Sequence, residues 1–175
     1  MAKNVVFSIV VVLVSISFFS QGNADMSLIE SVCKKTFDYK LCVSSLKSNP
    51  RSFNTDVKGL ARIMIDVTQS KIEVMIRVIQ QLGKNASDPR ERECLDNVCY
   101  PVYDLSRANI KQAIEDLQSN SFREAYTDVD DVYSNEEECE NSFAELEIKS
   151  PMTTINTHFA AYCKITEDII GILLK

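Results

Sequence analysis

Apolar residues recur at steps of three and four along most of this chain, and no stretch of any length alternates apolar and polar residues. The longest of these patterns covers residues 55–82, and it stops at Gly83 and the turn-forming residues 85–89. Such spacing places an apolar stripe along one side of an α-helix. The sequence therefore predicts an all-α protein.

A second helix is predicted to begin at Pro89, because proline suits the first turn of a helix and Asp88 can cap it. Its apolar stripe continues to Leu117. Pro101 lies inside this stripe. A proline there removes one backbone hydrogen bond, so we expect a kink at this point.

Two more helices complete the pattern. The third follows an apolar stripe from Phe122 past Leu146 that only Glu136 interrupts. The fourth is predicted to open at Pro151, with Ser150 as its N-cap. Four long helices joined by short loops are typical of an antiparallel up-and-down four-helix bundle, which would here occupy residues 55–175.

Residues 1–24 have the pattern of a secretory signal peptide. Lys3 supplies a basic start, residues 5–19 are apolar, and Gly22 and Ala24 offer small residues at the −3 and −1 positions of a cleavage site. The apolar run is shorter than the roughly 18 residues that span a bilayer. We therefore expect a secreted, soluble mature chain, residues 25–175, that folds as a single domain.

The net charge argues against two classes of partner. The chain holds 19 lysine and arginine residues and 25 aspartate and glutamate residues. Loss of Lys3 with the signal peptide gives the mature chain a formal charge of 18 − 25 = −7. An acidic chain without basic clusters is not expected to bind nucleic acid or an anionic membrane.

All six cysteines lie in the mature chain: Cys33, Cys42, Cys94, Cys99, Cys139 and Cys163. An even number of cysteines in a secreted protein indicates disulfides, but the sequence alone leaves fifteen pairings open. Two short helical turns are predicted within residues 28–49. A bridge between Cys33 and Cys42 would hold them as a hairpin over residues 25–50.

The motif Asn85-Ala86-Ser87 is an acceptor sequence for N-linked glycans in secreted proteins. It lies between Gly83 and Pro89, in a predicted turn. Asn85 is therefore a candidate glycosylation site.

The residues give no pattern of catalysis, and no metal or cofactor is expected. The cysteine spacings lack the two close pairs of structural zinc sites and the C-x-x-C of redox proteins. The acidic run from Asp128 to Glu140 fails the calcium-loop pattern, because Tyr133 and Cys139 stand where glycine and glutamate are required. His158, the sole histidine, has no nucleophile motif beside it and is expected at the edge of the bundle. These absences favour a binding protein over an enzyme.

Five segments of the mature chain form an ordered set of motifs. They are "CKKTFDYKLCVSSLKSNP" from Cys33, "TDVKGLARIMIDV" from Thr55, "CYPVYDLSRANIKQAIEDL" from Cys99, "CENSF" from Cys139 and "SPMTTIN" from Ser150. Together and in this order they resemble the plant invertase and pectin methylesterase inhibitors. The resemblance covers essentially the whole of residues 25–175 and implies an inhibitor domain without enzymatic activity.

The resemblance also implies a disulfide pattern. In the family the first two cysteines pair, and so do the next two, which lie forty residues apart with a tyrosine four residues after the first of them. This implies the bridge Cys33–Cys42. It also implies Cys99–Cys139, because Tyr103 follows Cys99 at that offset.

Cys94 and Cys163 are then left over. They would lie on the second and fourth helices, which are diagonal in a four-helix square. Their positions give an axial offset of roughly 10 Å, whereas a disulfide tolerates at most about 7 Å between Cα atoms. We expect both to be unpaired thiols.

Invertase inhibitors of this family are similar in using a Pro-Lys-Phe segment, between the second and third bundle helices, to enter the substrate cleft. The equivalent residues here are Asn120, Ser121, Phe122 and Arg123, of which Phe122 matches the family phenylalanine. The resemblance thus implies occlusion of the active site of a plant acid invertase, a β-fructofuranosidase. Phe122 also fits the core stripe of the third helix, and both interpretations stay open.

The alternative target is pectin methylesterase, a pectinesterase. Inhibitors of that enzyme lay helices of the bundle across the pectin-binding cleft, and they commonly carry threonine just before the fourth cysteine and Asp-Gly-Phe soon after it. Glu138 and "NSF" stand at these places here. The opening segment leans toward sequences called invertase inhibitors, so invertase is the first choice. A secreted helical bundle without inhibitory activity is the second alternative.

The expected partner is therefore a plant carbohydrate-active enzyme. In the family the N-terminal hairpin can mediate self-association, which adds a homodimer through residues 25–50. The signal peptide directs the chain to the apoplast and cell wall, with the vacuole as the other destination.

Overall fold

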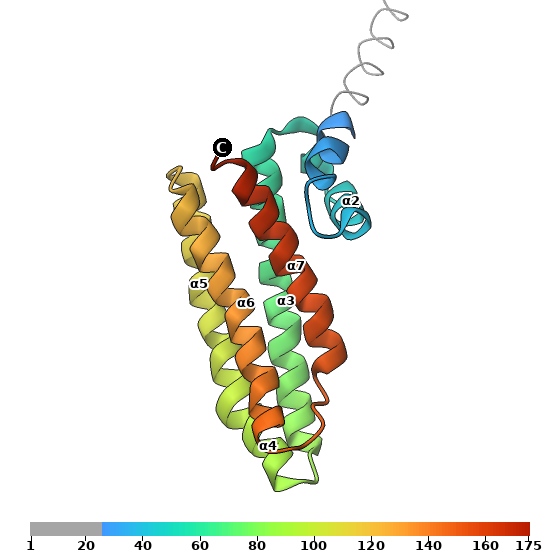
Figure 1. Ribbon diagram of the computed structural model, residues 1–175, viewed down its shortest axis with the longest axis vertical. Coiled ribbons are helices and arrows are strands. Elements are labelled where there is room, and N and C mark those ends of the chain that lie inside the picture. Colours follow the sequence, from blue (N-terminus) through green and yellow to red (C-terminus); the bar gives the residue numbers. More distant parts are fainter. Residues whose placement is uncertain (1–25) are drawn as a thin grey trace, which may run out of the picture.

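The computed structural model describes residues 26–175, so the predicted signal peptide lies outside the described residues. Within this range every regular element is helical. Figure 1 shows the long helical rods side by side, with a small helical hairpin against one side of the upper end. The predicted all-α four-helix bundle with an N-terminal hairpin is confirmed.

The first rod, α3 (Val57–Asn85), begins at Asp56, whose carboxylate accepts a hydrogen bond from the Gly59 amide at 2.8 Å. The prediction that Gly83 ends this helix is wrong. Gly83 is buried within α3, and a Cβ at this position would come within 2.5 Å of Asp96 Oδ1 on the next rod. Glycine here leaves room for the Asp96 side chain of the neighbouring helix. The helix α3 ends at Asn85, the first residue of the predicted turn 85–89.

The second rod consists of α4 (Pro89–Cys94), a π-helical turn η2 (Leu95–Cys99) and α5 (Tyr100–Gln118). Asp88 caps α4, as expected. In the π turn the Tyr100 amide bonds to the carbonyl of Leu95, five residues back. The disturbance expected at Pro101 takes the form of this wider turn, which comes directly before the proline.

The third rod, α6 (Phe122–Glu145), ends sooner than its apolar stripe indicates. Glu147 adopts a left-handed conformation with φ of 53°. The Ile148 amide then bonds to the Phe143 carbonyl at 3.1 Å, and the Glu147 amide bonds to the Ala144 carbonyl at 3.1 Å. These two bonds form a Schellman motif, so the prediction that the helix runs past Leu146 is wrong.

The fourth rod, α7 (Thr153–Ile172), begins later than predicted, with Met152 at the N-cap position. Ser150 does not cap the helix. Its hydroxyl instead accepts a hydrogen bond from the Met152 amide at 3.0 Å and donates one to Glu140 at 2.9 Å. Ser150 therefore stabilises the turn around Pro151 that leads into α7.

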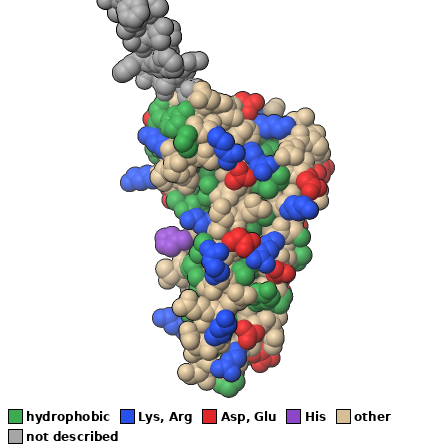
Figure 2. Space-filling view, turned by 180° about the vertical axis from the view of Figure 1, so that it is seen from behind, with side chains coloured by type: hydrophobic (Ala, Val, Ile, Leu, Met, Phe, Trp, Pro, Cys, Tyr) green, Lys and Arg blue, Asp and Glu red, His purple; other side chains and the backbone are tan. Residues whose placement is uncertain are grey.

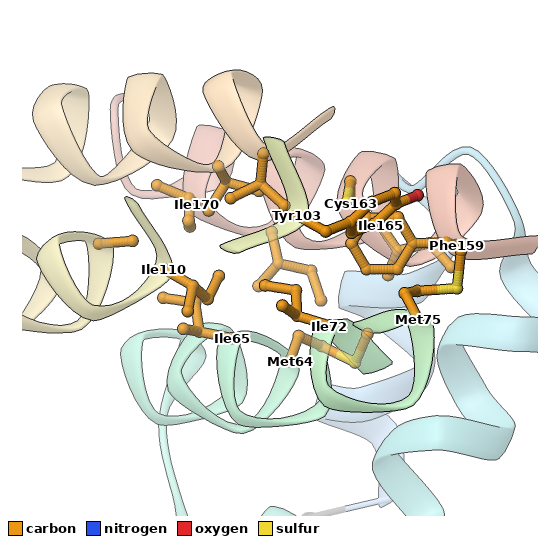
Figure 3. Packing of buried hydrophobic residues seen from close by; sticks show 14 of the residues in the cluster. Met64, Ile65, Ile72, Met75, Tyr103, Ile110, Phe159, Cys163, Ile165 and Ile170 are labelled. Carbon is orange, nitrogen blue, oxygen red and sulfur yellow. The ribbon is translucent and has the colours of Figure 1, made fainter. Parts of the chain in front are cut away.

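Helix contacts set the arrangement of the bundle. α5 packs against α3 and α6, and α7 likewise packs against α3 and α6, so α3 lies diagonally opposite α6. Ile72, Ile110 and Phe159 are among the side chains that meet in the buried centre (Figure 3). Two buried polar contacts cross between rods: Thr68 Oγ1 lies 3.0 Å from Thr166 Oγ1, and Asn135 Nδ2 donates to Ser106 Oγ at 3.1 Å. Such pairs favour one register of the helices over others.

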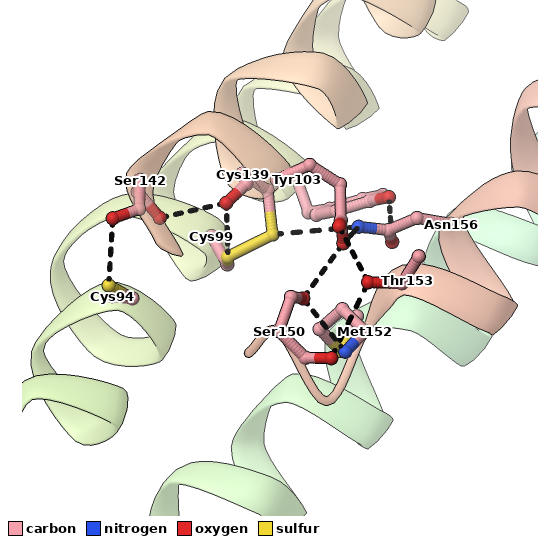
Figure 4. The surroundings of a disulfide bond; sticks show 10 residues. Cys94, Cys99, Tyr103, Cys139, Ser142, Ser150, Met152, Thr153 and Asn156 are labelled. Carbon is pink, nitrogen blue, oxygen red and sulfur yellow. Dashed lines mark hydrogen bonds between the residues drawn. A yellow bond between two sulfur atoms is a disulfide. The ribbon is translucent and has the colours of Figure 1, made fainter. Parts of the chain in front are cut away.

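A hydrogen-bonded cluster surrounds the disulfide Cys99–Cys139, which joins the π turn to α6 (Figure 4). The buried Tyr103 hydroxyl donates to Asn156 Oδ1 at 2.9 Å, and Asn156 Nδ2 donates to Glu140 Oε1 at 2.6 Å. α5, α6 and α7 are thereby connected through side chains at one level of the bundle. This explains why tyrosine at position 103 is useful: it reaches across the core to the diagonal helix.

Cys94 and Cys163 are both buried and carry free thiols. Cys94 Sγ donates to the Ser142 carbonyl at 3.3 Å (Figure 4). Burial raises the pKa of Cys163 well above the usual thiol value, with the nearby Glu167 and Glu136 charges adding to the effect. Burial shields both sulfur atoms from reagents, and the raised pKa keeps the Cys163 thiol protonated.

The hairpin consists of a helix over residues 26–33, α2 (Tyr39–Lys47) and a short 3₁₀ turn η1 (Pro50–Asn54). The disulfide Cys33–Cys42 joins its two helices. Asp38 caps α2 by accepting from the Leu41 amide at 2.9 Å. The Phe37 amide donates to Asp168 Oδ2 of α7 at 2.7 Å, so the hairpin is attached to the bundle as well as closed on itself.

Candidate target-binding surface

The turn between α5 and α6 holds the four candidate residues of the sequence prediction. Asn120 adopts a left-handed conformation with φ of 65°, which asparagine tolerates better than most residues. The Ser121 amide bonds to the Asp116 carbonyl at 2.8 Å, and the Asn120 amide bonds to the Leu117 carbonyl at 3.3 Å. α5 thus ends in a Schellman motif, which fixes the shape of the turn.

Lys58, in the first turn of α3, holds this turn from the side. Its Nζ donates to the Gln118 carbonyl at 3.0 Å and to Asn120 Oδ1 at 2.7 Å. The sequence prediction missed Lys58, because the two residues lie 62 positions apart and no local pattern connects them. The turn is therefore braced within α5 and again from α3.

The four candidate side chains differ in where they lie. Asn120 and Arg123 are exposed, whereas Ser121 and Phe122 are half-buried. The Phe122 side chain packs against the edge of the hydrophobic core. The structure brings the four residues together in one turn. Asn120 and Arg123 are exposed to a partner, although Asn120 Oδ1 also binds Lys58, and Phe122 packs against the core beneath them.

A carboxyl pair lies under the turn. Burial, and then hydrogen bonding to Asp116, raises the pKa of Asp128 to about 6, with the charges of Asp131 and Glu124 adding to the effect. Asp116 also contributes the carbonyl that accepts the Ser121 amide. In mildly acidic solution Asp128 therefore takes up a proton more readily than an ordinary aspartate, which lowers the negative charge near the turn.

The surface of α6 is strongly acidic. This helix carries one arginine and nine aspartate or glutamate residues, a formal charge of 1 − 9 = −8. Most of these side chains face solvent, but Glu136 is buried. Burial, and then the charges of Glu140 and Glu137, raise the pKa of Glu136 to about 7. The break in the apolar stripe that the sequence showed at Glu136 is thus a carboxyl that is held largely protonated.

Neither a metal site nor a membrane-spanning helix is found among the described residues. In the part of the chain that the structure describes, no three His, Cys, Asp or Glu side chains gather in a group that could hold a metal ion. Over the same residues no helix is both long and apolar enough to cross a membrane. His158 is exposed on α7, at the rim of a groove beside the hairpin.

The sequence matches the model of a known family, described as plant invertase/pectin methylesterase inhibitor, over residues 27–169. The chain belongs to this family. Its members inhibit enzymes and are not enzymes themselves. The match spans both the hairpin and the four rods, so it covers the fold described above and the α5–α6 turn.

Relatives within the family carry both kinds of name. An Arabidopsis thaliana protein named cell wall / vacuolar inhibitor of fructosidase 2 is 30% identical over 99% of this chain and 97% of its own length. A pectinesterase inhibitor from Actinidia deliciosa is also 30% identical, over 78% of this chain and 75% of its own. These identities establish the family and leave open which enzyme is the target.

A solved structure shares the fold. The crystal structure of a mutant form of an Arabidopsis pectin methylesterase inhibitor superposes with a TM-score of 0.68, covering 85% of this chain and 96% of that one. Sequence identity in this pair is 21%, so the likeness concerns the fold alone.

Proposed function

We propose that this protein is secreted and inhibits a plant acid invertase by placing the α5–α6 turn in the substrate cleft. The observation that carries the proposal is the turn itself: a Schellman motif braced by Lys58 presents Asn120 and Arg123 to solvent. A turn that is ordered before binding loses little conformational entropy on association. The relative named as an inhibitor of fructosidase, which matches over nearly its full length, supports the same target.

Arg123 has the right chemistry for such a cleft. Glycoside hydrolases work with a pair of carboxyl groups that flank the scissile bond. A guanidinium can bind a carboxylate through two parallel hydrogen bonds. Arg123 is exposed and forms no ion pair with any residue that the structure describes. It is thus available to neutralise the carboxylates of the enzyme, while the bulk of the turn excludes sucrose.

A second candidate function rests on the acidic face of α6. An inhibitor that lays its helices across a cleft needs a surface whose charge complements that cleft. The charge of −8 on α6 suits an enzyme with a cationic cleft, and Glu138 lies exposed on this face. Inhibition of a pectin methylesterase through α6 is therefore the alternative, and the pectinesterase inhibitor among the relatives supports it.

Parallel titrations test the proposal. The oxidised mature chain, residues 25–175, would be titrated against an acid invertase and a plant pectin methylesterase at acidic and at neutral pH. We expect inhibition of the invertase. Inhibition of the esterase alone would favour the α6 mechanism. Folded protein that inhibits neither enzyme would favour the second alternative, a secreted helical bundle without inhibitory activity.

Destination and oligomeric state complete the proposal. The name of the fructosidase inhibitor supports the cell wall or the vacuole as the place of action. Self-association would use the hairpin, residues 25–50, whose tip is exposed on the side of the bundle. Light scattering coupled to size-exclusion chromatography, on the mature chain and on a Phe37→Ser variant, would detect such a homodimer.

A further inference from the structure

The charges of the protein are separated between its two halves. Residues 26–85, the hairpin and α3, hold ten lysine or arginine and five acidic residues, a net charge of +5. Residues 86–175 hold eight basic and nineteen acidic residues, a net charge of −11. The most acidic helix, α6, lies diagonally opposite α3. The overall charge of −7 thus hides an excess of basic residues in the hairpin and α3.

The most exposed part of this basic segment is the hairpin tip. Phe37 is 74% exposed and Tyr39 is 40% exposed. Lys34, Lys35 and Lys40 lie on either side of them in the sequence, all exposed. None of the three lysines forms an ion pair within residues 26–175. Within residues 34–40, two exposed aromatic rings thus alternate with three exposed lysines that have no ion-pair partner among the described residues.

The tip is rigid without any ligand. The disulfide Cys33–Cys42 closes it, and the carboxylates of Asp38 and Asp168 accept backbone amides from Leu41 and Phe37. Both acidic groups that lie close to the tip are therefore engaged with its backbone. The backbone that carries the exposed Phe37 ring is thus fixed to the bundle, and the ring lies beside Tyr39 and three lysines in the sequence, where it is accessible to a partner.

A groove lies between α2, α3 and α7, and Leu41, the residue that follows the tip in the sequence, lines it. Its volume is about 290 Å³, and its apolar floor is formed by Leu41, Val74, Met75, Ile155 and Phe159. Lys71, His158 and Tyr162 complete the lining. Lys71 Nζ lies 4.7 Å from the centre of the Tyr162 ring, so cation and ring are again paired. His158 and neighbouring lysine and arginine side chains are visible on the face shown in Figure 2.

We propose that the hairpin tip and this groove form a second binding site, for an acidic polysaccharide built of uronate sugars. Each uronate unit offers a flat ring face, which can stack on Phe37, Tyr39 or Tyr162, and a carboxylate, which can meet a lysine. The alternation of basic and aromatic residues at the tip matches this repeat. Such a site would hold the inhibitor on the wall matrix. The choice of a uronate polymer among polyanions rests on the wall destination proposed above.

The same features disfavour an anionic membrane as the occupant. Binding to a bilayer interface needs a broad apolar face beside the basic residues. Among the exposed residues of the hairpin, Phe37 and Tyr39 are the only large apolar side chains, and Leu41 is turned into the groove. The excess of negative charge on residues 86–175 would also repel an extended anionic sheet more than a single thin chain.

The test measures binding of an oligogalacturonate of about ten units to the mature protein by calorimetry, in low salt, with neutral dextran and dextran sulfate as comparison polymers. We expect saturable binding of the oligogalacturonate, no binding of dextran, and loss of binding at about 0.5 M NaCl. The triple variant Lys34→Gln/Lys35→Gln/Lys40→Gln should weaken binding about tenfold, because three exposed ion pairs to the polymer, each individually weak, are lost. Phe37→Ser should weaken it about threefold to tenfold through the lost ring contact.

The matched control is Lys84→Gln/Lys149→Gln/Lys175→Gln, which removes the same charge from exposed lysines outside the hairpin and the groove. This control should change the affinity less than twofold. Three results would each overturn the proposal. The first is an equal loss of affinity in the control, and the second is the absence of any binding of the oligogalacturonate. The third is unchanged binding by Phe37→Ser together with equally strong binding of dextran sulfate. Binding to phosphatidylserine vesicles in the absence of oligogalacturonate binding would also overturn the proposal.

Enzyme inhibition is measured on the same variants. The tip lies on the α7 side of the upper end and the α5–α6 turn on the other side (Figure 1). The hairpin variants should therefore inhibit invertase as the unchanged protein does. Polysaccharide binding without inhibition would contradict the proposed function and support the second site. Inhibition without polysaccharide binding would support the proposed function and contradict the second site.

Discussion

Lys58 Nζ donates a hydrogen bond to Asn120 Oδ1 at 2.7 Å and thereby joins the first turn of α3 to the turn between α5 and α6. The same ammonium group also bonds to the Gln118 carbonyl at 3.0 Å. The candidate binding turn is thus held by a helix that contributes no residue to it. Its shape depends on the bundle as a whole.

Replacing Lys58 by methionine tests this dependence. Methionine keeps the length of the side chain and removes both hydrogen bonds, so the turn should become mobile. Because Lys58, Gln118 and Asn120 are near the surface, water replaces the lost bonds and the free energy of unfolding should fall by no more than about 1 kcal/mol. The inhibition constant for invertase should rise about threefold to tenfold. Lys111→Met, on the outer face of α5, is the control and should leave both quantities unchanged.

Stability should depend on pH through two carboxyl groups. The pKa of Asp128 is raised to about 6 and that of Glu136 to about 7, whereas both titrate near 4 in the unfolded chain. Between these values the folded state binds more protons than the unfolded state, so stability is fully present below about pH 4 and falls as pH rises toward 7. The buried Glu136 should account for roughly 2–3 kcal/mol of this change, and the more solvated Asp128 for less.

Urea denaturation at a series of pH values checks this prediction. Glu136→Gln keeps the shape of the neutral side chain and should flatten the profile between pH 4 and 7. Glu138→Gln, at an exposed position two residues along α6, should leave the slope unaltered. A Glu136→Gln protein with the same slope as the unchanged protein would show that Glu136 is ionised throughout.

Tyr103→Phe should destabilise the bundle by about 1–2 kcal/mol, because it leaves the buried Asn156 Oδ1 without its donor at an otherwise intact core position. The midpoint of urea unfolding measures the change. Tyr100→Phe serves as the comparison, because Tyr100 is half-buried and its hydroxyl makes no hydrogen bond to another described residue. Equal effects of the two substitutions would argue against a structural role for the Tyr103 hydroxyl.

Asn85 should carry an N-linked glycan. It is the exposed last residue of α3, and Ser87 of the acceptor motif is exposed as well. The mass of mature protein expressed in plant cells should exceed that of the chain and fall after treatment with a glycan-removing amidase. Asn85→Gln should abolish the excess without changing inhibition, because this end of α3 lies at the opposite end of the bundle from Lys58 and the turn it holds. A mass equal to that of the bare chain would refute the prediction.

Helical periodicity is strong enough to place the four rods, but the ends of the rods depend on contacts that the pattern does not encode. Gly83 looked like a terminator, and the fold instead uses it to admit Asp96. Ser150 has the side chain of an N-cap, yet Glu140 of the neighbouring helix engages it before α7 begins. In both cases a tertiary contact decided between two local structures that the residue could adopt.

In the candidate site, too, some features follow from the sequence and others depend on tertiary contacts. The resemblance to known inhibitors located the turn at Asn120 to Arg123, and the apolar stripe of the third helix already suggested the core contact that Phe122 makes. The contact of Lys58 with Asn120 was not predictable, because the two residues are 62 positions apart. The prediction about charged partners rested on the net charge of the mature chain. The placement of the acidic helix α6 diagonally opposite α3 became known only from the contacts between helices.

The central claim is that the α5–α6 turn, and not the face of α6, meets the enzyme. The most direct test compares the inhibition constants of two charge reversals against an acid invertase: Arg123→Glu in the turn and Glu138→Lys on α6. Both residues are exposed and neither forms an ion pair with a described residue, so both variants should fold normally. We predict that Arg123→Glu raises the inhibition constant at least about tenfold, through repulsion from the enzyme carboxylates, and that Glu138→Lys changes it less than about twofold. Loss of inhibition in Glu138→Lys with full inhibition in Arg123→Glu would contradict the claim and move the contact to α6.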